Sequence, residues 1–176
     1  LRLIAPGSDR VATFPVVAHP SEITFRDTDI VVMCMRTQHS LQALQDLRAA
    51  GVTSQHVFCA QNGVENERLA LRLFPNVHGV TVMLPATYLT PGEVLVHSGP
   101  SLGIFDIGRY PSGADEADHA LADALTAAGI QSFVDLEVMT SKYGKLLVNL
   151  NGVIQAALGP GVDTSDLRAA LQAEAE

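Results

Sequence analysis

The sequence is poor in aromatic and basic residues, and both shortages narrow what the protein can bind. It contains no Trp, aromatic residues make up 5% of the chain, and 11 Lys and Arg stand against 19 Asp and Glu, giving a formal net charge of −8. The basic residues are scattered rather than clustered. Nucleic-acid surfaces require basic patches, so we expect no nucleic-acid partner. An anionic small molecule stays allowed, because a local pocket can be positive on an acidic protein.

Cysteines and long apolar runs are also scarce. No apolar run approaches the roughly 20 residues of a membrane-spanning helix, and no signal peptide is recognisable, so we expect a soluble, cytoplasmic protein without a membrane partner. The two cysteines, Cys34 and Cys59, each lie in an apolar run, which favours buried, reduced thiols over a disulfide. No Cys/His cluster has metal-ligand spacing, so no metal site is predicted.

The first half of the chain alternates strand and helix patterns. Apolar runs typical of buried strands occur at 29–35, 56–60 and 77–84, and helical patterns separate them at 37–50 and 65–74. Nearly half of the 176 residues are hydrophobic, which is enough for a sizeable core. Strand, helix, strand, helix, strand predicts a mostly parallel α/β sheet.

The second half changes character after residue 136. Before that point we expect two strands around a turn within 86–97, a strand at 102–107, a helix at 114–128 and a strand at 130–134. From residue 137 onward an apolar stripe with helical spacing predicts a long helix that ends near Gly159. We therefore expect an α/β domain over residues 1–136 and the beginning of an all-α domain over residues 137–176.

Polar side chains follow two of the expected strands. Arg36 comes directly after the first apolar run, and Asn62 follows the second by two residues. Ligands of open α/β sheets bind beyond the carboxyl ends of the strands, so both residues are candidates for a binding site. The alternatives are a solvated arginine at a helix start and an ordinary Asn-Gly turn.

A third candidate lies on the long helix. Lys145 is followed one turn later by Asn149 on the same face, and the residues between and around them are apolar. Burial would lower the pKa of this lysine, which suits a general acid working near neutral pH. The alternative is a solvated stripe on the helix surface.

An ordered set of short motifs resembles the ketopantoate reductase family. The set comprises Arg36-Thr37-Gln38, Gln61-Asn62-Gly63, Pro91-Gly92-Glu93-Val94 and Lys142-Tyr143-Gly144-Lys145-Leu146-Leu147-Val148-Asn149. No single tripeptide is specific, but the order and spacing agree with the family over essentially the whole chain.

The resemblance implies a fold, a reaction and roles for particular residues. The family has a Rossmann domain followed by an all-helical domain, and its members reduce a 2-oxo acid, with 2-dehydropantoate (ketopantoate) as the expected substrate, by hydride transfer from NADPH. Lys145 would be the general acid that protonates the developing alkoxide. Asn149 would hold the substrate, Asn62 would lie between nicotinamide and substrate, and Arg36 would lie near the cofactor. A homodimer through the helical domain is a further expectation from the family.

The sequence also departs from the family pattern. It contains no G-x-G-x-x-G loop, so we expect a piece of a longer protein, truncated at both ends, that alone binds NADPH poorly and is inactive. Arg36 replaces a lysine, and Val153 stands where ketopantoate reductases carry a second asparagine. These departures keep two alternatives open: a reductase for a different 2-oxo acid, and a non-catalytic Rossmann-like binding or assembly module.

Overall fold

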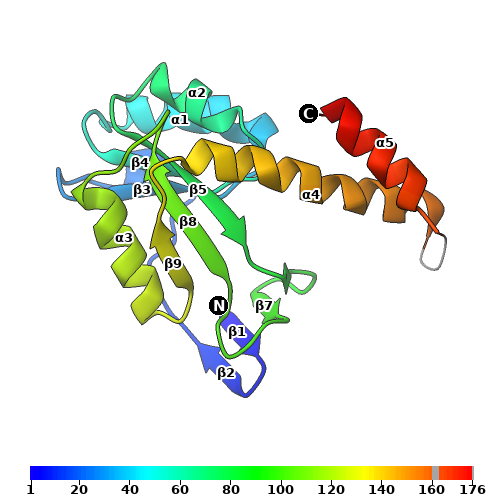
Figure 1. The fold of residues 1–176 in the computed structure, drawn as a ribbon. Coiled ribbons are helices and arrows are strands. Elements are labelled where there is room, and N and C mark those ends of the chain that lie inside the picture. The colour runs from blue at the N-terminus through cyan, green and yellow to red at the C-terminus, as the bar shows by residue number, and fades with distance from the viewer. Residues whose placement is uncertain (160–162, 176) are drawn as a thin grey trace.

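A five-stranded sheet forms the centre of the molecule (Figure 1). The computed structural model describes residues 1–159 and 163–175. The strands lie in the order β3 (Ile30–Met33), β4 (His56–Cys59), β5 (Val77–Met83), β8 (Ile104–Arg109) and β9 (Gln131–Val134). Neighbours are parallel except β5 and β8, which run antiparallel. The predicted mostly parallel α/β sheet is therefore confirmed.

Helices cover both faces of this sheet. They are α1 (Ser40–Ala49), α2 (Asn66–Leu71), α3 (Glu116–Ala127) and α4 (Val138–Leu158), with short 3₁₀ turns at Pro20–Glu22 and Thr37–His39. The last helix, α5 (Ser165–Ala175), packs against α4. Because side chains alternate along a strand, Val57 and Cys59 of β4 enter the core under α1 and α2, whereas Phe58 enters the core under α3.

The edge strand β3 departs from the prediction that it is buried on both faces. Ile30 and Val32 are 45% and 43% exposed, whereas Met33 is buried against the α1 side. The reason is that α3 packs on β8 and β9, at the other edge of the sheet, and no described element covers this face of β3. Cys34 continues the same face and is exposed, so the prediction of a buried thiol is wrong for Cys34 and confirmed for Cys59. Both thiols are free.

A second, four-stranded sheet contains the predicted hairpin. Its order is β2 (Ser8–Val11), β1 (Arg2–Ala5), β7 (Glu93–Val96) and β6 (Ala86–Thr87), and β6 pairs antiparallel with β7 as expected. The N–H of Glu93 donates to the carbonyl of Thr90 at 3.0 Å, and Gly92 has φ +84°. Pro followed by Gly in this conformation is typical of a type II turn. Strands β1 and β2 were not predicted.

Two glycines let α4 approach the sheet closely. Gly79 of β5 and Gly108 of β8 stand opposite each other in the strand register, beneath the first turn of α4. A Cβ on Gly79 would lie 3.2 Å from Val138, and a Cβ on Gly108 would lie 2.0 Å from the carbonyl oxygen of Asp135. The long helix predicted from residue 137 is thus present and rests on the same face as α1 and α2. Within the described residues, no helix has the length and apolar character needed to cross a membrane.

Candidate active site

The structure brings Lys145 and Asn62 together. Lys145 lies on α4, and its Nζ donates to Asn62 Oδ1 at 2.6 Å and to the backbone carbonyl of Val82, at the end of β5. Asn62 follows β4, so the contact joins the helix to the carboxyl ends of two parallel strands. Asn149, one turn further along α4, lines the same small recess. Its other lining residues are Gln61, Gly63, Val80, Thr81, Val82, Lys142 and Leu146.

Arg36 lies outside this recess, in a neighbouring open groove. Residues of the β3 and β4 ends line the groove, which has a volume of about 320 Å³. Small-molecule sites typically have about 300–1,000 Å³, so the groove lies at the lower end of that range. The lining residues are Cys34, Met35, Arg36, Thr37, Gln38, Ala60, Gln61 and Asn62. Gln61 and Asn62 belong to both spaces, so they form the wall between the groove and the Lys145 recess.

Lys145 has an unusual electrostatic environment. Burial lowers its pKa from the ordinary value of 10.5, and the nearby positive charge of Lys142 lowers it further. An ammonium has three N–H donors, and contacts with Asn62 and Val82 occupy two of them in the described part of the chain. The third N–H can donate to an oxygen in the recess.

Lys142, one turn earlier on α4, is fully engaged, and its contacts were not predicted. Its Nζ donates to the carbonyls of Cys59 and Gln61, at 3.1 and 3.0 Å, and to Glu67 Oε1. Both side chains of this ion pair are almost completely buried. Burial raises the pKa of Glu67, and the contact with Lys142 opposes this. Because all three N–H donors of Lys142 are used, none is left for a ligand. Its contacts with the carbonyls of Cys59 and Gln61 hold α4 against the end of β4.

A buried hydrogen-bond network positions the loop that carries Asn62. Gln61 Nε2 donates to the carbonyl of Met35 at 2.9 Å and to Ser40 Oγ at 2.7 Å. Ser40 donates to Asn66 Oδ1 at 2.9 Å, and Asn66 Nδ2 donates to the carbonyl of Asn62 at 3.2 Å. Sequence reasoning missed this network, although Gln61 lies in a predicted motif. It ties the ends of β3 and β4 together where the groove and the recess meet.

Two buried oxygens beside the recess have no partner within the described residues. They are Gln61 Oε1 and Thr81 Oγ1, and both residues line the recess. Buried polar atoms are normally hydrogen-bonded, so unpaired ones at a recess are candidates to receive polar groups of a ligand. Together with Lys145 and Asn149, they give the recess both donors and acceptors.

Comparison with known proteins gives consistent family and curated matches. A family model described as ketopantoate reductase PanE/ApbA matches residues 1–112. A 2-dehydropantoate 2-reductase from Halobacterium salinarum is 30% identical over 172 residues, which are 95% of this chain and 54% of the relative. Another from Pyrococcus abyssi is 26% identical over 121 residues, 69% of this chain and 39% of the relative. The chain thus spans about half the length of the curated relatives it matches.

Solved structures share the fold. A PanE/ApbA family ketopantoate reductase from Ralstonia eutropha has a TM-score of 0.80 at 23% identity, over 99% of this chain and 58% of that one. A D-mandelate dehydrogenase, solved with NADH and anilino(oxo)acetate, has a TM-score of 0.68 at 24% identity, over 85% of this chain and 47% of that one. At these identities the likeness establishes a common architecture.

Proposed function

Because the chain belongs to the ketopantoate reductase family, we propose that it forms the proton-donating half of an active site that reduces a 2-oxo acid with NADPH. The leading candidate substrate is 2-dehydropantoate. The observation that carries the proposal is the third N–H of Lys145, which has no partner among the described residues. Lys145 and Asn62 both line the recess. Of the two lysines on this face of α4, only Lys145 retains a donor, since the described contacts of Lys142 use all three.

The described residues offer a site for the nicotinamide end of the cofactor only. The groove beside Asn62 and Oε1 of Gln61, which has no partner among the described residues, fit a polar ring system such as the nicotinamide end. The phosphates of a dinucleotide require a glycine-rich loop at a helix N-terminus, and these 176 residues contain no G-x-G-x-x-G. When bound, the nicotinamide supplies the hydride that the carbonyl carbon of the substrate accepts.

In this proposal Lys145 moves the proton. Its Nζ donates a hydrogen bond to the carbonyl oxygen of the substrate and thereby stabilises the negative charge that grows there during reduction. The lowered pKa makes the ammonium a stronger acid, so proton transfer to the alkoxide is easier than from a solvated lysine. Asn62 and the carbonyl of Val82 hold the ammonium in place, which fixes the direction of its third N–H.

Asn149 and Arg36 are assigned to binding. Asn149 is exposed on α4 and lines the Lys145 recess, so its amide is available to a substrate hydroxyl or carboxylate. Arg36 lies in the adjoining groove, where its guanidinium offers charge to an anionic group of the cofactor. In this proposal the substrate therefore binds against α4, and the cofactor binds in the groove at the ends of β3 and β4.

Val153 favours a second candidate, a different 2-oxo acid. It lies two turns after Lys145 on α4 and is 64% exposed, at the position where ketopantoate reductases carry a second asparagine. An apolar side chain offers no hydrogen bond to a substrate hydroxyl and accommodates an apolar substituent instead. The related fold solved as a D-mandelate dehydrogenase with anilino(oxo)acetate makes an aromatic 2-oxo acid a sensible comparison.

The test is NADPH oxidation by the complete natural protein, followed as loss of the reduced cofactor's absorbance, with 2-dehydropantoate and a panel of other 2-oxo acids. Turnover with 2-dehydropantoate supports the leading proposal. NADPH binding with turnover of only bulkier, apolar 2-oxo acids supports the alternative based on Val153. If the complete protein does not bind NADPH at all, the reductase proposal fails and a non-catalytic Rossmann-like module takes its place.

A further inference from the structure

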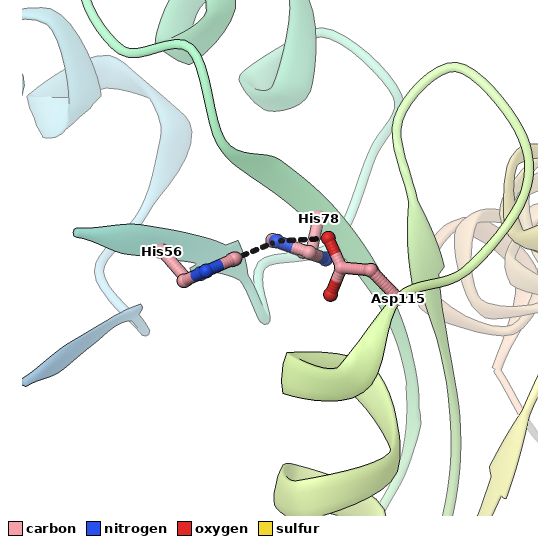
Figure 2. A group of neighbouring side chains, drawn as sticks. All are labelled: His56, His78 and Asp115. Atoms are coloured by element: carbon pink, nitrogen blue, oxygen red, sulfur yellow. Dashed lines mark hydrogen bonds and ion pairs between the residues drawn. The ribbon is translucent and has the colours of Figure 1, made fainter. Parts of the chain in front are cut away.

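A second cluster of reactive side chains lies at the opposite ends of β4 and β5 from the Lys145 recess. His56 is the first residue of β4, His78 is the second residue of β5, and Asp115 directly precedes α3. Figure 2 shows the three side chains pointing toward one another. His56 Nδ1 is 2.8 Å from His78 Nε2, and His78 Nε2 is 4.0 Å from Asp115 Oδ2.

The sheet register brings the two imidazoles together. His78 pairs with Phe58, and His56 lies two residues before Phe58, so all three rings project from the same face. The rings of Phe58 and His78 stack with centroids 4.3 Å apart, which fixes the His78 ring. The N-terminus of α3 closes over this face and supplies Asp115.

Asp118 sets the tautomer of His78. Both side chains are fully buried, and His78 Nδ1 lies 2.7 Å from Asp118 Oδ1. A carboxylate accepts hydrogen bonds, so the hydrogen of a neutral His78 ring belongs on Nδ1 and the lone pair on Nε2 faces His56 and Asp115. A carboxylate that holds the distal nitrogen of a histidine in this way is the usual outer partner of a metal-binding imidazole.

We propose that His56 Nδ1, His78 Nε2 and Asp115 Oδ2 bind one divalent transition-metal ion, with Zn²⁺ as the reference ion. Two imidazoles and one carboxylate suit zinc, and a solvent molecule completes a four-coordinate shell. Bonds of about 2.0–2.1 Å place neighbouring ligand atoms roughly 3.4 Å apart in such a shell. The three ligand atoms already lie within 4.8 Å of one another. Side-chain shifts of roughly 1 Å are therefore sufficient.

The charged groups around the His56–His78–Asp115 cluster include some that favour the binding of a cation and one that opposes it. Asp115 and Asp118 outnumber the single guanidinium of Arg109, so the cluster is negative when the imidazoles are neutral. Arg109 Nη1, however, lies 2.5 Å from Asp115 Oδ2 and competes for that oxygen. Its side chain is 35% exposed, so it can turn toward solvent when a metal displaces it.

The site is independent of the proposed reductase chemistry, because it lies at the other end of the strands. A metal there would cross-link β4, β5 and the start of α3. The expected consequence is structural: the ion stabilises the folded chain in proportion to its affinity, and the melting temperature rises with its concentration.

The test is Zn²⁺ titration against a chromophoric chelator. It is carried out in a Cys34→Ser background, because a free, exposed thiol such as that of Cys34 is itself a candidate zinc ligand. We expect one Zn²⁺ per chain above any weak surface binding, and affinity at least about tenfold lower in His56→Gln and in Asp115→Asn. Both variants are chosen to fold: His56 is only partly buried, and asparagine keeps the helix cap that Asp115 forms with the N–H of Ala117. Circular dichroism without metal checks this.

Arg109→Gln provides a test with the opposite sign. It removes the competitor for Asp115 Oδ2, so Zn²⁺ should bind several-fold more tightly, and Co²⁺ in its place should give the intense visible bands of a four-coordinate site. Absence of stoichiometric Zn²⁺ binding would overturn the proposal, and so would affinity that His56→Gln and Asp115→Asn leave unchanged. Weaker binding in Arg109→Gln would exclude Asp115 Oδ2 as a ligand and overturn the assigned site.

Discussion

At the scale of single residues, the two lysines on one face of α4 have different positions and different roles. Lys142 is saturated by two backbone carbonyls and a buried carboxylate, whereas Lys145 is only part-buried and keeps one donor. Buried ion pairs contribute little net stability compared with apolar side chains, but losing one partner is costly. The pair of Lys142 with Glu67 therefore serves mainly to set the position of α4, and through it that of Lys145.

Replacing Lys145 by Ala should remove the proton donor and leave the fold intact. In the complete protein, we expect kcat to fall by about 10²–10⁴-fold, the usual contribution of a general acid, with the Kd of NADPH changed by less than about twofold. Steady-state kinetics with the preferred 2-oxo acid and fluorescence titration of NADPH measure the two effects. Arg48→Ala, an exposed change on α1, is the matched control. Unchanged kcat in Lys145→Ala would exclude this residue from the chemistry.

The pH dependence of turnover should report the environment of Lys145. A general acid works in its protonated form, so the rate is lost as pH rises through its pKa. Because burial and Lys142 lower that pKa, the alkaline limb of kcat should lie below the ordinary lysine value of 10.5. A kcat profile that stays flat up to that value, measured where the protein remains folded, would contradict the assignment.

At the scale of elements, the sequence predicted the parts that have strong local patterns. The apolar runs at 29–35, 56–60 and 77–84 correspond to β3, β4 and β5. For β4 and β5 the reason is that strands in the middle of a sheet covered on both sides are apolar on both faces. Strand β2 escaped detection because Ser8–Val11 is largely exposed and polar, so it has no apolar pattern. Strand β1, Arg2–Ala5, was missed as well, and only its last residue is buried. The exposure of Ile30 and Val32 was missed for another reason: which strand lies at an edge is a property of the sheet order.

In the candidate site, too, some residues could be predicted from local patterns and others could not. Arg36, Asn62, Lys145 and Asn149 could be proposed from the sequence because each lies at an expected strand end or on one helix face, and because the motifs around them resemble those of the family. The Lys142–Glu67 pair and the His56–His78–Asp115 cluster join residues far apart in the chain, and their members have no common motif. Spacing along the sequence therefore could not predict contacts that only the pairing of β4 with β5 and the docking of α3 and α4 create.

Gly108→Ala should test how closely α4 must approach the sheet. The new Cβ would lie 2.0 Å from the carbonyl oxygen of Asp135 and 3.1 Å from Val138, so either the backbone before α4 or the strand must move. We expect a loss of about 3 kcal/mol or more in the free energy of unfolding, at the upper end of overpacking costs. Urea denaturation followed by circular dichroism measures it.

Gly152→Ala is the matched control for that change. Gly152 lies in the interior of α4 with nothing within 4 Å of its would-be Cβ, so alanine should be neutral or stabilise by up to about 1 kcal/mol. If Gly108→Ala is as well tolerated as Gly152→Ala, the close packing of α4 against β5 and β8 is not required.

At the scale of the whole molecule, the described chain has an unprotected sheet edge. Strand β3 ends the five-stranded sheet, and along it the apolar side chains Ile30 and Val32 are almost half exposed. An apolar edge strand offers unpaired backbone groups as well as apolar surface, and it is a common site of association between chains. The formal charge of −8 opposes association at long range, but salt screens this repulsion.

We therefore expect the 176-residue chain by itself to associate through β3, more strongly as salt rises. Val32→Lys should raise the monomer fraction, because a charged side chain on an edge strand cannot be buried between two sheets. Leu89→Lys is the control: Leu89 is 88% exposed between β6 and β7, and this change alters the net charge equally. Light scattering over a concentration series, at low and high salt, measures the monomer fraction of each variant. Equal effects of the two substitutions would mean that net charge, and not the β3 edge, governs association.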